Sequence, residues 1–199
     1  MSNSIIAIEG INGVGKTEVI RNCRVHLQDS TRDFWFGHEM QDGVGAAFQQ
    51  LMRRGAELPP QALALMFAAC RLDSHQRRCT DQEPGTVLVY DRFLWSSLAY
   101  HSVRCDPLWV QGINQQSPRA DLNILLDADP EELSKRTANT KFIGTFPVDL
   151  EFRRQVRNNF LDLAKQNPGH AVAVDAMQQP GEMAQQVVAE IRGFLAKTV

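Results

Sequence analysis

Residues 10–17 read GINGVGKT, which matches the phosphate-binding pattern GxxxxGK(S/T). The apolar run Ile5–Glu9 precedes this stretch, and Lys16–Leu27 follows with apolar residues at helical spacing. The pattern therefore lies between a predicted strand and a predicted helix, which is the context that its chemistry requires. There, glycines let successive backbone N–H groups turn toward phosphate oxygens, and the helix N-terminus adds positive potential. The stretch predicts an α/β domain that binds a nucleoside triphosphate.

Each position of this loop has an expected role in holding the triphosphate. The Lys16 ammonium is expected to neutralise β- and γ-phosphate oxygens, and the Thr17 hydroxyl to ligate Mg²⁺. No guanine-reading NKxD segment occurs, which argues against a GTPase, and large ATPases usually need a longer chain. A small-molecule kinase that uses ATP and Mg²⁺ is favoured. The residues expected to bind the cofactor are Gly10, Asn12, Gly13, Val14, Gly15, Lys16 and Thr17.

The rest of the chain continues the alternation of strand and helix. Val87–Tyr90 and Ile124–Leu126 are continuously apolar, which is typical of parallel strands covered on both faces. We therefore predict a P-loop three-layer sandwich, an α/β fold with a five-stranded parallel sheet and helices on both faces. The other strands are expected at Ile5–Glu9, Asp33–Phe36 and Ala171–Asp175, and the helices at Lys16–Leu27, Ala46–Arg53, Gln61–Cys79, Trp95–His101, Pro107–Gln115, Pro130–Ala138, Leu150–Lys165 and Gly181–Ala196.

Composition indicates one domain, residues 1–199, and excludes several classes of protein. The 21 basic and 23 acidic side chains give a net charge of -2, so no global field gathers nucleic acid. The longest uncharged apolar run, Ala62–Cys70, is too short to span a bilayer, and a secretory signal pattern is missing. We expect a cytoplasmic protein with neither nucleic-acid nor membrane partners. The four cysteines lack metal-site spacing and are expected to be separate thiols. Residues 137–148, with no steady period, are the predicted lid.

Five segments, taken in order, carry a resemblance to a known family. They are IIAIEGINGVGKT at 5–17, LMFAACR at 65–71, VYDRFLWSSLAY at 89–100, PRADLNILLDADPEEL at 118–133 and LEFRRQVRNNFLDLA at 150–164. In this arrangement the chain resembles thymidylate kinase, within the nucleoside monophosphate kinases, over nearly its whole length. The third segment is the most specific, because it resembles the family's DR(Y/F/H)xxSxxAY stretch at the expected distance from the loop.

The resemblance implies phosphoryl transfer from ATP, with Mg²⁺, to a pyrimidine deoxynucleoside monophosphate. The acceptor would be dTMP or a 5-substituted dUMP, and the product its diphosphate. Arg92 would bind the acceptor phosphate, because its planar fork can hold two oxygens. Phe67 would stack on the base, and Tyr100 would favour deoxyribose. The family's habit of pairing implies a homodimer. The implied substrate-binding residues are Glu39, Phe67, Arg71, Arg92, Ser97 and Tyr100, and the implied metal-binding residues are Thr17 and Asp91.

The sequence also departs from the family pattern at three places. Asn12 replaces the usual loop aspartate, the Arg-Glu-Pro-Gly-like turn is replaced by residues 37–43, and the lid lacks its usual arginines. The expected catalytic residues are therefore Lys16, Arg92, Arg136 and Lys141. Two alternatives stay open: a deoxynucleoside kinase with Glu39 as general base, and a catalytically degenerate nucleotide-binding protein of the same fold.

Overall fold

A parallel sheet forms the centre of the computed structural model, which describes residues 3–28, 30–136, 146 and 149–198. The strands lie side by side in the order β2-β3-β1-β4-β5, and every neighbouring pair is parallel. The chain first adds strands on one side of β1 and then on the other. Their bounds are β1 Ser4–Glu9, β2 Phe34–Gly37, β3 Val87–Asp91, β4 Leu122–Asp127 and β5 Ala171–Asp175.

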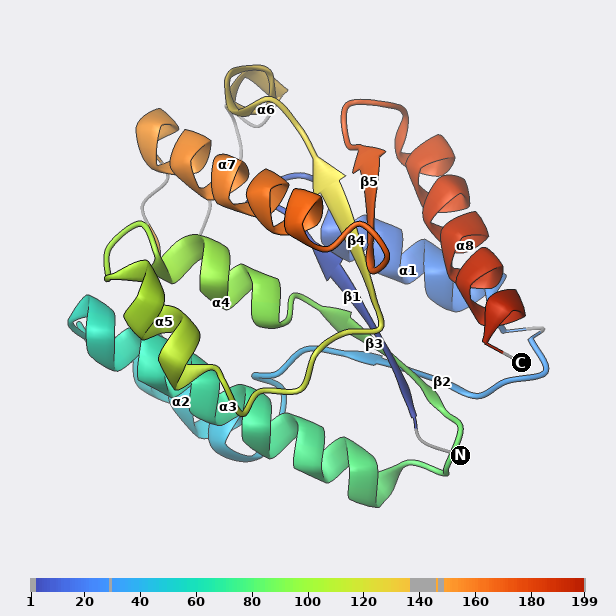
Figure 1. Ribbon diagram of the computed structural model, residues 1–199, viewed down its shortest axis with the longest axis horizontal. Coiled ribbons are helices and arrows are strands. Elements are labelled where there is room, and N and C mark those ends of the chain that lie inside the picture. The colour runs from blue at the N-terminus through green and yellow to red at the C-terminus, as the bar shows by residue number, and fades with distance from the viewer. Residues whose placement is uncertain (1–2, 29, 137–145, 147–148, 199) are drawn as a thin grey trace.

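Helices cover both faces of this sheet. Figure 1 shows α1 and α8 packed side by side on one face, and α4 and α7 on the other, with α2, α3 and α5 beyond them. The helices are α1 Lys16–His26, α2 Gly43–Arg53, α3 Pro60–Asp81, α4 Leu94–His101, α5 Pro107–Ile113, α6 Pro130–Arg136, α7 Leu150–Gln166 and α8 Pro180–Lys197. The predicted three-layer α/β architecture is confirmed.

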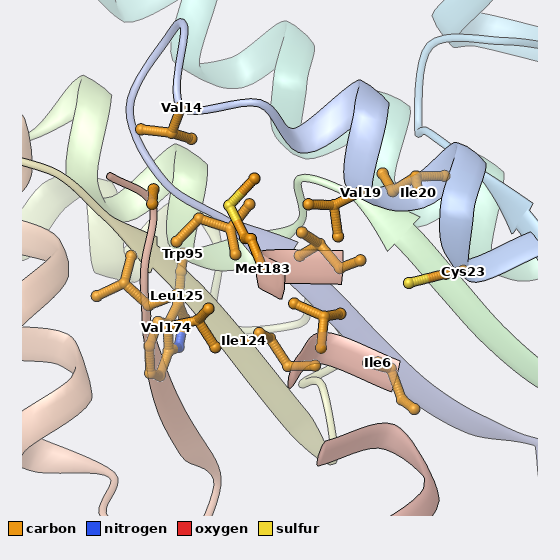
Figure 2. Close-up of a cluster of buried hydrophobic side chains, with 14 of the residues drawn as sticks. Ile6, Val14, Val19, Ile20, Cys23, Trp95, Ile124, Leu125, Val174 and Met183 are labelled. Carbon is orange, nitrogen blue, oxygen red and sulfur yellow. The ribbon is translucent and has the colours of Figure 1, made fainter. Parts of the chain in front are cut away.

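The core lies between the sheet and its helices. β1, β3 and β4 are buried along almost their whole length, because the helical layers exclude water from both sides. Figure 2 shows Val19 and Ile20 of α1 with Met183 of α8 beside strand residues such as Ile124. β2 lies at an edge of the sheet, and its first three residues are only half-buried. The central strands therefore give the loops at their ends a rigid base.

The helix α2 begins earlier than the sequence predicts, at Gly43 instead of Ala46. The reason is a contact from a distant part of the chain: Asp73 of α3 accepts a hydrogen bond from the Val44 amide at 2.9 Å. This carboxylate satisfies one of the amides that a helix N-terminus leaves open. The other helix ends match the predicted ones to within two residues, apart from that of α6, whose predicted end at Ala138 lies outside the described residues.

Two further expectations concern the cysteines and the membrane. All four cysteines are free, as the sequence predicts, and the structure shows that Cys23 and Cys70 are buried. None of the helices in the described part of the chain has the length and apolar character that a bilayer crossing requires.

Candidate functional site

The phosphate-binding loop connects β1, the middle strand, to α1. Gly10 has φ +139°, and a Cβ atom there would lie 2.4 Å from the Leu126 carbonyl oxygen, so only glycine fits. Gly15, at the start of α1, also has positive φ. The Val14 side chain lies in the core, as Figure 2 shows, and this anchors the loop to the layer below. The loop backbone is thereby held open at the N-terminus of α1.

Lys16 is a buried cation, and among the described residues no carboxylate lies within hydrogen-bond distance of it. Its Nζ donates to the carbonyl oxygens of Gly10 at 3.0 Å and Ile11 at 2.9 Å. Burial, and then the nearby positive charge of Arg92, lower the pKa of Lys16 well below its ordinary value. An incoming anion would relieve both effects, since it would restore opposite charge around the ammonium. The loop is thus prepared for a phosphate group.

Arg92 follows the end of β3 and reaches the same loop. The parallel register pairs Asp91 with Ile8 of β1, and the Arg92 amide donates to the Ile8 carbonyl at 3.0 Å. Its φ of 67° is unusual for a residue with a side chain. The guanidinium donates to the Gly10 carbonyl at 2.8 Å and to Asn12 Oδ1 at 2.6 Å. Arg92 and Lys16 therefore bring two positive charges to one end of the sheet.

Glu9, the last residue of β1, holds this arrangement together. Its fully buried carboxylate accepts the amides of Phe93 at 2.9 Å and Ser96 at 3.2 Å, and the Ser96 hydroxyl at 2.6 Å. Ser96 Oγ in turn accepts from Arg92 Nη1 at 3.1 Å. Burial raises the pKa of Glu9, against the opposing effect of these hydrogen bonds and of Arg92. Glu9 thus fixes both the first turn of α4 and the turn that carries Arg92.

A cavity of about 620 Å³ opens beside these charges. The predicted site residues that line it come from the loop, from the segment between β2 and α2, from the end of β3, and from the helices α3 and α4. Its volume is in the range that small-molecule sites occupy. Glu18, Met40, Ser96, His101 and Phe146 line it as well, and sequence analysis did not single them out. The predicted residues in the lining are Asn12, Gly13, Gly15, Lys16, Thr17, Glu39, Phe67, Asp91, Arg92, Ser97 and Tyr100.

Aromatic rings form the wall of the cavity that faces away from the charged loop. Phe67 of α3 lies 5.4 Å from His101 and 6.1 Å from Phe146, measured between ring centroids. Tyr100 lies 4.8 Å from Phe146, and the Arg92 guanidinium lies over the Tyr100 ring at 5.3 Å. A flat apolar group would find stacking partners here. The cavity is therefore charged at one end and aromatic at the other.

Arg71 lies behind this wall and is completely buried. Its Nη1 donates to Asn114 Oδ1 at 2.5 Å, and its Nη2 donates to Glu39 Oε1 at 3.3 Å and to Ser97 Oγ. Its Nε lies 3.0 Å from Glu39 Oε2. Arg71 does not line the cavity, although Glu39 and Ser97 do. The guanidinium is thus directed to protein oxygens and fixes two groups of the lining.

Of the two catalytic residues expected at the lid, the structure describes Arg136. Arg136 ends α6 and donates to the Ala176 carbonyl at 2.7 Å and to the Gly13 carbonyl at 3.5 Å. The Arg136 side chain therefore contacts the backbone of the phosphate-binding loop. Lys141 and most of the predicted lid, 137–145 and 147–148, lie outside the described residues. The α7 arginine Arg157 forms ion pairs with Asp127 and Asp129, at 2.8 and 3.1 Å.

Thr17 and Asp91, the predicted metal ligands, both line the cavity next to Lys16. Within the described ranges, no three His, Cys, Asp or Glu side chains gather into a metal-binding group. Hydroxyl and carboxylate oxygens are nevertheless the donors that Mg²⁺ prefers. The ion usually takes one or two of them and completes its shell with water and substrate phosphates. The residues present fit such a phosphate-borne Mg²⁺.

The sequence signals for the missed residues differ. Ser96 is the serine of the DR(Y/F/H)xxSxxAY stretch, and Glu9 ends the strand before the loop, so both could have been found from their positions. His101 directly follows the same stretch, but a lone histidine at a helix end carries no pattern. Phe146 reaches the cavity only through tertiary structure.

Comparison with known proteins agrees with this geometry. A family profile described as thymidylate kinase matches residues 8–187. A probable thymidylate kinase of Pyrobaculum calidifontis is 34% identical over 194 residues, covering 96% of this chain and 97% of its own. A probable thymidylate kinase of Pyrococcus abyssi is 32% identical with the same coverage, and a thymidylate kinase of Bifidobacterium longum subsp. infantis is 30% identical, covering 100% of this chain and 90% of its own. The chain belongs to the thymidylate kinase family.

Proposed function

We propose that this protein transfers the γ-phosphoryl group of ATP, with Mg²⁺, to a pyrimidine deoxynucleoside monophosphate and releases the diphosphate. Family membership supports the coarser activity, phosphoryl transfer to a nucleoside monophosphate. One observation carries the finer proposal: a single cavity joins the loop with Lys16, the guanidinium of Arg92 and the ring of Phe67. The loop with Lys16 would bind the donor, Arg92 would bind the acceptor phosphate, and Phe67 would stack on the base.

The chemistry needs little beyond position and charge. A monophosphate oxygen is already anionic near neutral pH, so the acceptor requires no general base. Lys16 would neutralise the transferred group, and Arg92 would hold the acceptor phosphate in line with it. Mg²⁺, bound through Thr17 and Asp91, would neutralise charge on the donor phosphates. Direct transfer without a phosphorylated protein intermediate follows.

The base and sugar would occupy the aromatic end of the cavity. Phe67 offers a half-buried ring face for stacking, and Tyr100 lies between Arg92 and Phe146, where a sugar would connect phosphate to base. Arg71 would act on the base side by fixing Glu39 and Ser97. Arg136, adjacent to the loop backbone at Gly13, is the described arginine that would support the donor side.

A coupled ADP-release assay with ATP and Mg²⁺ tests this proposal across dTMP, dUMP, dCMP, dGMP, dAMP and thymidine. We expect turnover with dTMP or dUMP. In Arg92→Ala, kcat/KM for the acceptor should fall by about a hundredfold or more, as happens when a preorganised charge donor is removed. Arg104→Ala, at an exposed arginine outside the cavity lining, is the matched control and should keep full activity. ATP binding without turnover on any acceptor would contradict the proposal and favour a degenerate nucleotide-binding protein.

The same assay separates the deoxynucleoside kinase alternative. There Glu39 would have to accept a proton, yet both of its oxygens lie against Arg71, which disfavours such a role. Turnover on thymidine that Glu39→Gln abolishes, while ATP binding is retained, would support that alternative. For a monophosphate kinase, Glu39→Gln should weaken acceptor binding, and the variant should not phosphorylate thymidine.

We also propose that two copies of the chain pair through the face formed by α2 and α3. Leu51, Leu65 and Leu72 are 44%, 50% and 41% exposed there, which is unusual for so many large apolar side chains on neighbouring helices. Light scattering after size-exclusion chromatography should give a mass of twice 22.4 kDa. A monomer at micromolar concentration would contradict this part of the proposal.

A further inference from the structure

The turn between β2 and α2, residues 38–42, supplies part of the cavity lining. Its residues Glu39 and Met40 line the cavity, and Met40 packs against the same apolar cluster as Phe67. The turn contains no proline, and Gly43, with φ +52°, follows it directly. A glycine without a neighbouring proline leaves the backbone many conformations. Tertiary contacts therefore have to hold the turn in this position.

The helix α3 holds the turn with two arginines that are seven residues apart. Residues at this spacing lie on the same face of a helix, because seven residues make almost two full turns. Arg71 binds Glu39 near the start of the turn, and Arg78 Nη2 donates to Asp42 Oδ2 at its end. Both arginines are buried, at 0% and 7% exposed. The turn is thus attached to one face of α3 at both ends.

Asp42 does not make the local contact that its position favours. It directly precedes α2, where an aspartate ordinarily accepts a hydrogen bond from an amide of its own helix. Its side chain makes no such bond, and Asp73 of α3 accepts from the Val44 amide at 2.9 Å instead. A local capping contact is thereby replaced by two contacts to α3. Both of them fix where the turn lies relative to that helix.

The Asp42–Arg78 ion pair is better suited to fixing a position than to adding stability. Among the described residues, Asp42 Oδ1 and Arg78 Nε are buried and lack a hydrogen-bond partner. Taking two charges out of water costs free energy, which such an incomplete pair recovers only in part. Arg78 also lies over the Trp35 ring at 5.0 Å and 3.5 Å from Asp81 Oδ2 of its own helix. Losing the Asp42 contact should therefore displace the turn and leave α3 folded.

We propose that Arg78 is a positioning residue of the acceptor site, which acts through Asp42 to set where the turn, and with it Met40, meets a bound nucleoside monophosphate. The inference rests on the proposed function, since Met40 lies beside the Phe67 ring that would stack on the base. Arg78 is outside the cavity lining and would touch neither substrate. Because the contact sets the shape of the lining, it should affect dTMP and dUMP alike.

Steady-state kinetics of Asp42→Asn and Arg78→Gln in the full-length protein test the proposal. Asparagine precedes helices as readily as aspartate, so Asp42→Asn should fold. We expect each variant to raise the KM for dTMP and for dUMP about tenfold, the order of effect for residues coupled in one network, with unchanged kcat and KM for ATP. The double variant should rise no further, because both changes remove the same contact. Arg78→Lys, which keeps the charge, should recover part of the loss.

Controls separate positioning from a structural effect. Asp81→Asn removes the other carboxylate partner of Arg78, at the end of α3, and should leave both acceptor KM values unchanged. Thermal denaturation reports folding, and a merely structural role would lower the melting temperature and kcat at unchanged KM. That result in Asp42→Asn, or additive effects in the double variant, would overturn the inference while wild-type turnover upholds the proposed function. A wild-type protein that neither binds nor phosphorylates any monophosphate would overturn both.

Discussion

Side chains in and behind the cavity differ in how many of their polar atoms already bind protein atoms, and this determines which atoms each can offer a ligand. Arg71 has its nitrogens against protein oxygens, whereas Lys16 donates only to two loop carbonyls. Carbonyl oxygens carry no full negative charge, and the nearby carboxylates Asp91 and Glu9 offset the effects of burial and of Arg92 on Lys16 only in part. We propose that a phosphate group supplies the missing negative charge.

Lys16→Met tests that assignment, because methionine keeps the length of the side chain without its charge. We expect kcat to fall by about a hundredfold or more, since charge developing on the transferred phosphoryl group would lose a preorganised partner. Folding should be little affected. Calorimetric titration with ATP and turnover assays measure the two parts. Near wild-type turnover in a folded Lys16→Met variant would rule out its role as the phosphate ligand.

His101 also predicts a pH dependence of stability. Its folded-state pKa of about 4 lies below the ordinary value of 6.5, so the unfolded chain binds the proton first. Stability therefore falls as pH is lowered from about 6.5 to about 4, by up to about 3 kcal/mol. Arg71 is the charged group that faces the ring and opposes its protonation. Urea unfolding at pH 7 and pH 4 checks this.

The comparison with His101→Phe isolates the histidine, because the buried carboxyls Glu9 and Glu39 have raised pKa values that act in both proteins. The wild type should lose about 3 kcal/mol more than the variant between the two pH values. Equal losses would show that the imidazole is not held neutral.

At the scale of elements, the site depends on how α4 meets the end of β1. Glu9 accepts two amides of the first turn of α4 and the Ser96 hydroxyl, which then accepts from Arg92. The strand, the helix and the Arg92 turn are thus linked through one carboxylate. This link also explains how Arg92 keeps a φ of 67°, since its neighbours on both sides are hydrogen-bonded.

Glu9→Gln is expected to loosen that link while preserving side-chain volume. The NH₂ group that replaces one carboxylate oxygen cannot accept a hydrogen bond, so the variant should lose about 1–3 kcal/mol of stability. The KM for the acceptor should rise more than the KM for ATP, because Arg92 is displaced and the loop is not. Urea denaturation and acceptor titrations measure both. Glu182→Gln, at an exposed residue of α8 outside the cavity lining, is a control expected to change stability little.

Unchanged acceptor kinetics in Glu9→Gln would contradict the positioning role, even if stability fell. A loss confined to stability would assign Glu9 to the fold alone. An acceptor KM close to the wild-type value in Glu9→Asp would support the requirement for a carboxylate at this position.

Over the whole molecule, local sequence patterns predicted most of the architecture. The continuous apolar runs identified the buried strands, and GINGVGKT located the turn between β1 and α1. Parallel strands bring their carboxyl ends to one edge, so Asp91 and Arg92 could be expected beside the loop before any coordinates. The early start of α2 could not be predicted, since it depends on Asp73 from another helix.

The candidate site was less predictable, because its polar partners come from distant segments. Arg71 was expected to bind the substrate, but its bonds to Asn114 and Ser97 depend on how α5 and α4 pack against α3. His101 has no sequence pattern that separates a cavity wall from an ordinary buried histidine. Side-chain type and spacing predicted which segments meet, and tertiary contacts determined which atoms remain open to a ligand.

Identification of the products tests the central claim most directly. Wild-type protein incubated with ATP, Mg²⁺ and dTMP would be followed by phosphorus NMR, and the protein itself by mass spectrometry. The account predicts that ADP and dTDP appear in equal amounts and that the protein carries no phosphate. Bound ATP with no dTDP, or a phosphorylated protein intermediate, would contradict it.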